Sequence, residues 1–560
     1  MKKETGVLAG LVLIGVFTVH ADVKLTALFN DHMVLQREAP VPVWGTAAVG
    51  EKVTVEFADQ KKSATAGADG RWLVKLDPLK ASAEARVLSV SSINLKSEIT
   101  NLKCSDVLVG EVWLASGQSN MGSPLFAAHN AAEILPKALD PQLRFFRVKN
   151  RTAAEPQSAL TGQWETATPD TAKNFSAVAY FFARELRLTQ KCPIAILQGA
   201  WGGTDIETWI SLAGLQQEPV LKKALDRWNG AWEQYQKVVA NPQLVTDYEK
   251  DLKQWQKEVA PAYAVTLKEY EKAKAAGKAI GPKPQPARPE PSNPDPMGMP
   301  SPSRRPSTPT VNFNGVIAPL IPYAIRGVIW YQGENNGGRG MEYRELFPRL
   351  IEDWRNVWQK AGYEAGKDFP FLFVQLPSNG QDTSPVAAQG WPWLREAQFM
   401  ALKVPRTGMA ITLDVGDPNN VHPGDKIDVG QRLALLAKKM AYGEKIVASG
   451  PLYQEFKAEA DGAVRVNFTE TGSGLTIGQS PWYATGVAPF PKDKLIGFFI
   501  AGEDKKWVEA SARIEGNSVV VSCAQVPKPA AVRYGWANSP RCNLYNKEGL
   551  PASPFRTDTW

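Results

Sequence analysis

Gly110-Glu-Val-Trp-Leu-Ala-Ser-Gly-Gln-Ser-Asn-Met121 is the stretch of sequence that decides the fold. Its first half is an apolar run typical of a buried strand, and the run breaks at Gly117. Ser119 follows at the turn, among small polar residues that leave backbone N–H groups available to an anion. A serine placed where a strand turns is a common way to expose a nucleophile. The stretch therefore predicts a catalytic serine, provided that the chain also supplies a base.

Histidine is scarce, and this scarcity narrows the search for the base. The chain has four histidines, and His20 lies in an apparent leader. Of the other three (His32, His129 and His422), only His422 stands in a context typical of catalysis. Pro423 follows it and makes the chain rigid, and a helix is expected beyond. One serine and one histidine far apart in sequence are the pattern expected of a nucleophile and its base before folding.

The N-terminus predicts export. Met1-Lys-Lys3 precedes an apolar run over residues 6–19, and Val19-His-Ala21 fits a small-residue cleavage site. These features are typical of a secretory signal peptide over residues 1–21, which is too short and wrongly flanked for a stable membrane anchor. We expect a secreted or periplasmic protein that starts near Asp22 and has no membrane contact after cleavage. An uncleaved anchor is the alternative.

The charge balance argues against a nucleic-acid partner. The formal net charge is +7, and it falls by one once Lys2, Lys3 and Glu4 leave with the leader. This small surplus is spread over a long chain, without an arginine stripe or interleaved basic and aromatic residues. The 18 Trp residues suit core packing, stacking platforms for sugars, or both.

Four cysteines, Cys104, Cys192, Cys523 and Cys542, enter an oxidising compartment if the protein is exported. The chain has no C-x-x-C and no cluster of Cys with His, so we expect no zinc site. A disulfide between Cys523 and Cys542, and one between Cys104 and Cys192, are both open. The sequence does not fix the connectivity.

Two sequence patterns alternate along the mature chain. Residues 22–105 alternate apolar and polar positions between Gly/Asp turns, which predicts an N-terminal antiparallel β-sandwich. Residues 106–213 and 311–445 place buried-type strands between helical stretches, which predicts an α/β domain with a mostly parallel sheet covered by helices on both faces. Residues 446–560 return to short alternating strands and form a C-terminal β domain. The predicted buried strands are Val107–Leu114, Ile194–Gln198, Gly327–Tyr331, Phe371–Gln375 and Met409–Asp414.

Residues 214–310 interrupt the α/β pattern as an insertion. Apolar residues recur at three- and four-residue steps from Leu221 to Tyr235 and again from Tyr248 to Val259, so each set lies on one helix face. We expect two or three helices packed as a hairpin that buries these faces together. Residues 281–309 are rich in Pro, Ser and Arg, which predicts an extended or disordered connector. The insertion either caps the active site or is a tolerated surface arm.

Polar residues follow several predicted strands, at the carboxyl ends where the chemistry of such sheets takes place. Gly202, in Ala200-Trp-Gly-Gly-Thr-Asp205, allows a close backbone approach. Val328-Ile-Trp-Tyr-Gln-Gly-Glu-Asn-Asn336 carries three amides and one acid. Asp414-Val-Gly-Asp-Pro-Asn-Asn-Val-His-Pro423 carries the histidine. These blocks predict a serine, a base and oxyanion donors at one edge of the sheet.

Together these blocks resemble the SGNH hydrolase superfamily, and more closely the sialate O-acetylesterase family. The resemblance rests on four segments in family order and covers most of the mature chain except the insertion. Ser119 lacks a Gly-x-Ser-x-Gly motif, which departs from the standard α/β-hydrolase signature. The resemblance implies a three-layer α/β/α hydrolase domain that removes O-acetyl groups from sugars through an acyl-enzyme, without a metal. The segments are Gly117-Gln-Ser-Asn-Met121, Trp201-Gly-Gly203, Trp330-Tyr-Gln-Gly-Glu334 and His422-Pro423 with Lys426.

Carried over by position, the resemblance makes Ser119 the nucleophile and His422 the general base. It implies an oxyanion hole built from the backbone N–H groups of Ser119 and Gly202. An amide side chain completes this hole, either from Gln332 or from the pair Asn335 and Asn336.

The acid that orients the histidine is where this sequence departs from the family. The superfamily pattern places Asp three residues before His, and many family members place it two before, but this chain has Asn419 and Asn420 there. We favour Asp417 as the acid, with Asp414 and Glu334 as alternatives. Glu334 and Asn420 are also candidates for substrate contact. A Ser–His dyad with only polar support is equally open.

The leading expectation is a secreted carbohydrate O-acetylesterase that acts on O-acetylated sialic acid or plant polysaccharide. An esterase specific for acetylated xylan or xyloglucan is the alternative within the same chemistry. A non-catalytic carbohydrate-binding protein on a hydrolase scaffold is a different class, and the missing Asp is its best support. A lipase of the same superfamily would need a broad apolar groove, which the two β domains and polar loops disfavour.

Overall fold

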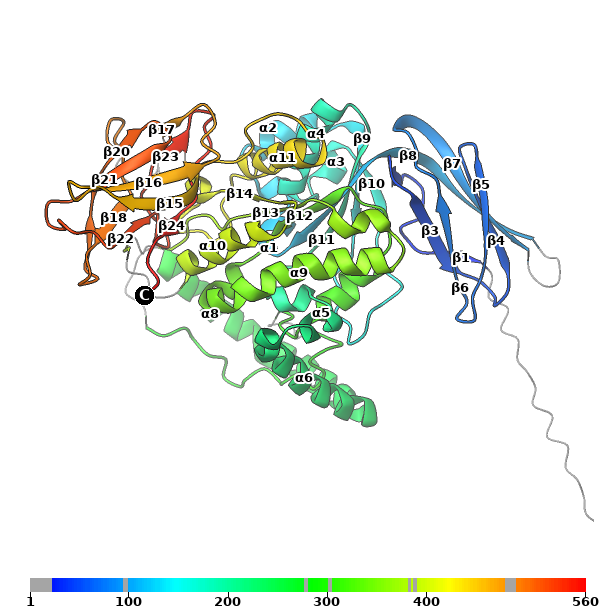
Figure 1. The fold of residues 1–560 in the computed structure, drawn as a ribbon. Helices are drawn as coiled ribbons and strands as arrows, with labels where there is room; N and C mark the ends of the chain where they lie inside the picture. The colour runs from blue at the N-terminus through cyan, green and yellow to red at the C-terminus, as the bar shows by residue number, and fades with distance from the viewer. Residues whose placement is uncertain are drawn as a thin grey trace, which may run out of the picture.

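The computed structural model describes residues 23–93, 99–275, 281–300, 305–380, 384–385, 390–478 and 490–560. The predicted signal peptide, residues 1–21, lies outside these ranges. Three units lie in a row, with an α/β unit between an N-terminal and a C-terminal β unit (Figure 1). The fold is therefore mixed α/β with additional β-sheets, as the alternation of sequence patterns predicts.

A mostly parallel sheet forms the middle of the protein, in the order β10-β9-β11-β8-β12-β13-β14. Neighbours from β9 to β14 run parallel, and β10 pairs antiparallel with β9. The predicted buried strands all belong to this sheet, although the last ends at Ala410 and leaves Asp414 in a 3₁₀ turn. The strands are β8 (Ile99–Gly117), β9 (Asp140–Arg147), β10 (Trp164–Ala167), β11 (Ile194–Ala200), β12 (Gly327–Tyr331), β13 (Phe371–Val374) and β14 (Thr407–Ala410).

Helices cover both faces of this sheet (Figure 1). The helices α4 (Ala177–Gln190) and α11 (Ile427–Ala441) pack against each other on one face. On the other face α9 (Gly340–Lys360) packs against α10 (Trp391–Met400). Each of the four has an apolar stripe turned to the sheet and polar residues outside. Shorter helices are α1 (Ser119–Gly122), α2 (Ala131–Ile134), α3 (Pro169–Ala172) and α5 (Leu212–Gln216).

The N-terminal β unit shares a strand and a hydrophobic core with the α/β unit. The first part of β8 pairs with β7, and its last part pairs with β11 and β12. One continuous cluster of buried apolar side chains runs from Val23 to Ala448. The other strands of this unit are β1 (Lys24–Leu25), β2 (Val34–Gln36), β3 (Val41–Thr46), β4 (Lys52–Phe57), β5 (Gln60–Thr65), β6 (Arg71–Leu76) and β7 (Ser82–Ile93).

The C-terminal β unit has a hydrophobic core of its own, between Val464 and Phe555. Its strands form the antiparallel orders β15-β16-β21-β20, β17-β23 and β19-β18-β22-β24. They are β15 (Leu452–Ala458), β16 (Val464–Thr469), β17 (Leu475–Ile477), β18 (Phe498–Ala501), β19 (Trp507–Glu509), β20 (Ser511–Glu515), β21 (Ser518–Ser522), β22 (Ala531–Tyr534), β23 (Leu544–Asn546) and β24 (Phe555–Arg556).

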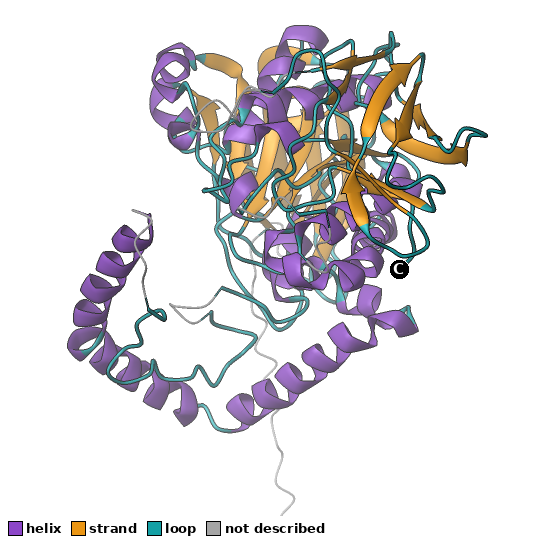
Figure 2. Ribbon diagram, turned by 90° about the vertical axis from the view of Figure 1, so that its left-hand side faces the viewer, coloured by secondary structure: helices purple, strands orange, loops and turns teal. Residues whose placement is uncertain are grey.

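The insertion is not the compact helical hairpin that its apolar faces predict. The helices α6 (Lys222–Ala240), α7 (Gln243–Glu258) and α8 (Ala260–Ala275) follow one another around an open arc (Figure 2). The Pro-rich segment contacts α7 instead, since the indole Nε1 of Trp255 donates to the Arg288 carbonyl at 2.8 Å. The described part of that segment, residues 281–300 and 305–309, forms neither helix nor strand, as predicted.

All four cysteines are free thiols, so neither of the two possible disulfides forms in this structure. Burial raises the pKa of Cys104 to about 11 and that of Cys542 to about 12. Such thiols are protonated and unreactive at neutral pH. Among the described residues, no helix has the length and apolar character needed to span a bilayer.

Candidate active site

Ser119 stands directly after β8, at the carboxyl edge of the central sheet. Gly117 ends the strand with φ +134°, and a Cβ there would overlap the Tyr331 carbonyl oxygen, so the turn requires glycine. The Gln118 N–H donates to the Tyr331 carbonyl at 2.9 Å, and the Trp201 N–H donates to the Gly117 carbonyl at 3.0 Å. The turn that carries the serine is therefore bonded to the ends of both neighbouring strands.

His422 meets the serine, as the sequence predicts. Its Nε2 lies 2.7 Å from Ser119 Oγ, within hydrogen-bond distance. The histidine comes from the loop between β14 and α11, where its backbone N–H donates to Asn420 Oδ1 at 2.9 Å. Burial and the nearby charge of Lys426 lower the pKa of His422. The neutral imidazole, which can accept a proton from the serine, therefore persists to lower pH than it would in water.

The structure does not bring Asp417, the acid favoured from the sequence, to the imidazole. Its Oδ1 accepts the backbone N–H of Asn419 at 2.8 Å, and its carbonyl accepts the N–H of Asn420 at 3.1 Å. Within the described part of the chain, no carboxylate pairs with the His422 ring. Asp417 and Asn420 thus shape the loop backbone, because the side chains of a tight turn bond their own main chain first.

Asp414 is engaged elsewhere. It makes a two-point ion pair with Arg432 of α11, at 2.6 and 2.8 Å, and accepts the Tyr545 hydroxyl at 3.2 Å. Bidentate Arg–carboxylate pairs fix geometry as well as charge. Asp414 therefore joins α11 and the C-terminal β unit to the end of β14, and it does not orient the histidine.

Glu334 reaches the site through Asn120, the residue after the nucleophile. Asn120 Nδ2 donates to Glu334 Oε1 at 2.5 Å and to the Val421 carbonyl at 2.9 Å, and Asn120 Oδ1 accepts Lys426 Nζ at 2.6 Å. Burial raises the pKa of Glu334. Glu334 Oε2 is buried without a hydrogen-bond partner among the described residues. The acid thus lies behind the nucleophile turn and makes no contact with the imidazole.

The three candidate oxyanion amides differ in how many of their N–H hydrogens already bond other residues of the protein. Gln332 Nε2 donates to the Thr204 carbonyl at 3.0 Å and to Asn336 Oδ1 at 2.7 Å, which uses both of its hydrogens. Asn336 is buried and donates to Glu207 at 3.2 Å. Asn335 is exposed, and one of its two Nδ2 hydrogens goes to Asp205 Oδ1 at 2.6 Å. Asn335 is therefore the amide best placed to offer a donor to a substrate.

Gly202 packs directly against the nucleophile. A Cβ on Gly202 would lie 3.0 Å from Ser119 Cβ, so only glycine brings this backbone so close. The next residue, Gly203, faces the Pro-rich part of the insertion, since a Cβ there would lie 2.8 Å from Arg305 Cγ. One end of the insertion therefore lies beside the predicted oxyanion hole.

Comparison with known proteins decides the family. A model described as a sialic acid-specific acetylesterase, a carbohydrate esterase, matches residues 109–275. Sialate O-acetylesterases from Rattus norvegicus and Homo sapiens are 29% and 28% identical over 95% of this chain, and the match covers 94% and 92% of their own length. A crystal structure described as a novel carbohydrate acetylesterase from Xanthomonas citri is 34% identical, with a TM-score of 0.72 over 96% of this chain and 100% of that one.

The chain belongs to the sialate O-acetylesterase family. It is a serine esterase of the carbohydrate esterase class. An acetylated carbohydrate is the substrate class consistent with that family.

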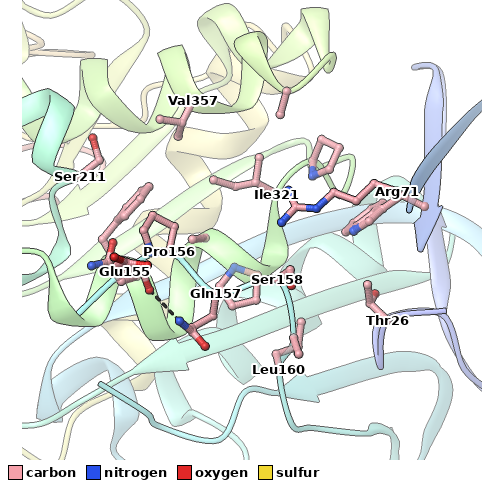
Figure 3. A pocket seen from close by; sticks show the side chains of 18 of the residues that line it. Thr26, Arg71, Glu155, Pro156, Gln157, Ser158, Leu160, Ser211, Ile321 and Val357 are labelled. Carbon is pink, nitrogen blue, oxygen red and sulfur yellow. Dashed lines mark hydrogen bonds between the residues drawn. The ribbon is translucent and has the colours of Figure 1, made fainter. Parts of the chain in front are cut away.

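Ser119 and His422 lie outside a large cavity in the described part of the chain. That cavity has a volume of about 1150 Å³ and lies between the N-terminal β unit, the loop 154–160 and α6. Figure 3 shows its lining, with Arg71 on one side and Ser211 and Val357 on another. Neither Ser119 nor His422 lines it. The cavity and the Ser119–His422 pair therefore lie in different parts of the molecule.

Three residues of the esterase site have roles that the sequence does not reveal. Asn120 lies inside the stretch that contains the serine, and Lys426 inside the motif of the histidine, but their contacts become visible only in the folded chain. Asp205, whose pKa burial and the charge of Glu207 raise to about 6, holds Asn335. All three are polar residues close in sequence to glycine or to the catalytic pair. This closeness in sequence is the feature by which they could have been found.

Proposed function

We propose that this protein is an exported carbohydrate O-acetylesterase that works through a Ser119–His422 dyad and an acyl-enzyme. The observation that carries this proposal is the 2.7 Å separation of Ser119 Oγ and His422 Nε2. Nucleophile and base within hydrogen-bond reach are the diagnostic pattern of covalent catalysis by serine. The family of the chain supports the same chemistry.

In the first half of the reaction, His422 Nε2 takes the proton of Ser119 Oγ as the oxygen attacks the acetyl carbonyl carbon. The backbone N–H groups of Ser119 and Gly202 and the second Nδ2 hydrogen of Asn335 hold the oxyanion. The intermediate collapses, the C–O bond to the sugar breaks, and the sugar oxygen leaves with the proton from His422. In the second half, His422 deprotonates a water molecule, which releases acetate and returns the proton to Ser119.

The dyad lacks a carboxylate on the imidazole. Hydrogen bonds of the loop backbone, such as the one between His422 N–H and Asn420 Oδ1, replace the orienting acid in this proposal. The imidazolium that forms during catalysis is then less stabilised than in a full triad. No metal or cofactor takes part, which stays a prediction.

Two sugar classes are proposed as substrates. The mammalian relatives are named for sialate, which makes O-acetylated sialic acid the first choice. The Xanthomonas citri relative is described only as a carbohydrate acetylesterase, and acetylated xylan and xyloglucan are the sugars to compare with it. Export through the signal peptide 1–21 and a secreted or periplasmic location belong to the same proposal.

The domain layout is likewise proposed. It comprises a β-sandwich over 22–105, a three-layer α/β/α SGNH-hydrolase domain over 106–213 and 311–445, the insertion 214–310, and a C-terminal β domain over 446–560. Arg305 beside Gly203 supports a role of the insertion in shaping the sugar subsite.

The test is acetate release from O-acetylated sialic acid, acetylated xylan and acetylated xyloglucan oligosaccharides. We expect S119A to lower kcat at least about 10³-fold on every substrate that the wild type hydrolyses, because the nucleophile is lost. S116A is the matched control, since Ser116 Oγ is buried near the same turn without a hydrogen-bond partner among the described residues. Activity that survives in S119A would exclude Ser119 as the nucleophile. Acetate from one substrate alone would name the sugar.

A further inference from the structure

The side chain next to the nucleophile links the two halves of the reacting pair. Asn120 is fully buried and directly follows Ser119. Its Nδ2 donates to the carbonyl of Val421, which directly precedes His422, at 2.9 Å. A single amide therefore joins the turn of the serine to the loop of the histidine.

This amide can serve that purpose in only one orientation. The oxygen and nitrogen ends of Asn have nearly the same shape but opposite hydrogen-bonding roles. Lys426 Nζ, at 2.6 Å from Asn120 Oδ1, can only donate. The Val421 carbonyl and Glu334 Oε1, on the Nδ2 side, accept. A pure donor on one side and acceptors on the other hold the amide the right way round.

The loop that carries His422 depends on hydrogen bonds from side chains such as Asn120. Since no carboxylate of the described residues pairs with the His422 ring, the position of the imidazole depends on its backbone. Two side chains bond that backbone, since the Asn120 amide donates to the Val421 carbonyl and Asn420 Oδ1 accepts the His422 N–H. The loop is also bonded farther from the histidine, where the Gly380 N–H donates to the Pro418 carbonyl and the His129 N–H donates to the Gly424 carbonyl. Loss of the Asn120 bond would remove the hold next to His422 itself.

We propose that Lys426 is a positioning residue of the Ser119–His422 pair, whose ammonium fixes the amide of Asn120 and thereby keeps the histidine within reach of the serine. This inference rests on the proposed function. Lys426 acts through Asn120 and makes no hydrogen bond to Ser119 or His422 among those of the described residues.

The surroundings of Lys426 are unfavourable for a cation. The side chain is 1% exposed, and burial lowers its pKa to about 8 although Glu334 and Asp425 favour the charged form. Its Nζ also lies 5.6 Å from the centre of the Tyr331 ring. An apolar side chain of similar length would avoid the desolvation of a charge. Lys426 therefore carries a desolvation cost that its contacts with Asn120 and Tyr331 must offset.

The experiment compares K426M with the wild type and with K438M, a control on the same helix-bearing segment, within α11. We expect K426M to lower kcat about 10- to 100-fold, because a small misplacement of a reacting group has effects of this size. KM for an aryl acetate should stay within about twofold, since the substrate is not contacted. The thermal unfolding temperature should not rise, because buried Asn120 Oδ1 loses its donor and Glu334 loses the nearby positive charge. K438M should match the wild type.

The pH profile supplies a readout that a merely structural role would not move. The charge of Lys426 lowers the pKa of His422, so its removal should shift the acid limb of kcat/KM to higher pH. The wild type should also lose activity above about pH 8, where Lys426 loses its proton, and K426M should lack that limb. If K426M does not fold, K426Q keeps a donor without the charge and should show the same shift of the acid limb.

Wild-type kcat with an unshifted acid limb, in K426M or in K426Q, would overturn the inference. Failure of the proposed function is recognised separately, because S119A would then retain activity whatever the result at Lys426.

Discussion

Three amides follow β12, yet the structure gives them two different tasks. Gln332 and Asn336 are buried and bond each other and the segment that follows β11, at the Thr204 carbonyl and the Ile206 N–H. They hold the ends of β11 and β12 together. Asn335 lies between them in sequence but is exposed, and Asp205 orients its amide. At the scale of single residues, exposure to solvent separates the two buried structural amides from Asn335, the proposed oxyanion donor.

Substitution of the exposed amide should therefore affect mainly kcat, and substitution of a buried amide should affect mainly the free energy of unfolding. N335A should lower kcat by about 10²–10³, the loss typical of one oxyanion donor, with little change in stability. N336A should lower the free energy of unfolding by about 1–3 kcal/mol, because it leaves the Ile206 N–H and one of the two Nε2 hydrogens of Gln332 without a partner. Aryl acetate kinetics and urea unfolding of both variants check this. Equal loss of kcat without a change in stability in N336A would contradict the assignment.

At the scale of elements, the serine turn depends on how closely two strand ends approach. Gly117 has φ +134°, which strains any other residue, and a Cβ there would also overlap the Tyr331 carbonyl oxygen. Gly202 has an ordinary backbone, and only the closeness of Ser119 requires it. The first glycine is thus needed for folding, and the second for the position of the nucleophile.

G202A should retain its fold and lose activity. The added Cβ would lie 3.0 Å from Ser119 Cβ, closer than carbon atoms normally pack, so Ser119 or the backbone at residue 202 must shift by a few tenths of an ångström. We expect kcat to fall about 10- to 100-fold for such a displacement. G230A, in the interior of α6 where a Cβ meets open space, is the control and should be as active and slightly more stable. Wild-type kcat in G202A would show that the serine tolerates the shift.

The helices and strands and the pair Ser119 and His422 could be predicted from the sequence, because short stretches of residues indicate them. Buried strands appear as apolar runs, and Ser119 and His422 stand in distinctive motifs. The partner of the apolar face on α7 could not be predicted, since a Pro-rich segment contacts it in place of another helix. The contacts of Asp417 could not be predicted either, because its bond to the Asn419 N–H appears only in the folded loop, where no carboxylate of the described residues pairs with the His422 ring. Contacts between distant segments leave no periodic trace in the chain.

At the scale of the whole molecule, polar contacts join the C-terminal β unit to the esterase. Arg395 of α10 is fully buried and donates to the carbonyls of Leu376 and Pro377 after β13 and of Ala537 and Asn538 after β22. Gln375 Nε2 also donates to Ser553 Oγ at 3.0 Å. Because the two units have separate hydrophobic cores, such bonds determine how firmly they hold together.

R395M should weaken this junction. It removes a donor from four carbonyls, of which Pro377 keeps the Trp391 indole N–H and Asn538 keeps the Asn379 N–H. We therefore expect a loss of at least about 2 kcal/mol in the free energy of unfolding. R71M, at an exposed position of the N-terminal β unit, is the control and should change stability by no more than about 0.5 kcal/mol. Calorimetry should show a lower first transition for R395M alone. An unchanged transition would mean that the apolar contacts of the junction suffice.

The strand β8 has a consequence for anyone who shortens or recombines this protein. Its 19 residues, about 60 Å if fully extended, pass from the N-terminal sheet to the serine without a linker. A chain trimmed at residue 106 would begin inside a strand and expose the backbone edges that β7 covered, which invites aggregation. There is therefore no domain boundary at which the N-terminal sheet could be exchanged for another. It can be inherited or engineered only together with the strand that delivers the nucleophile.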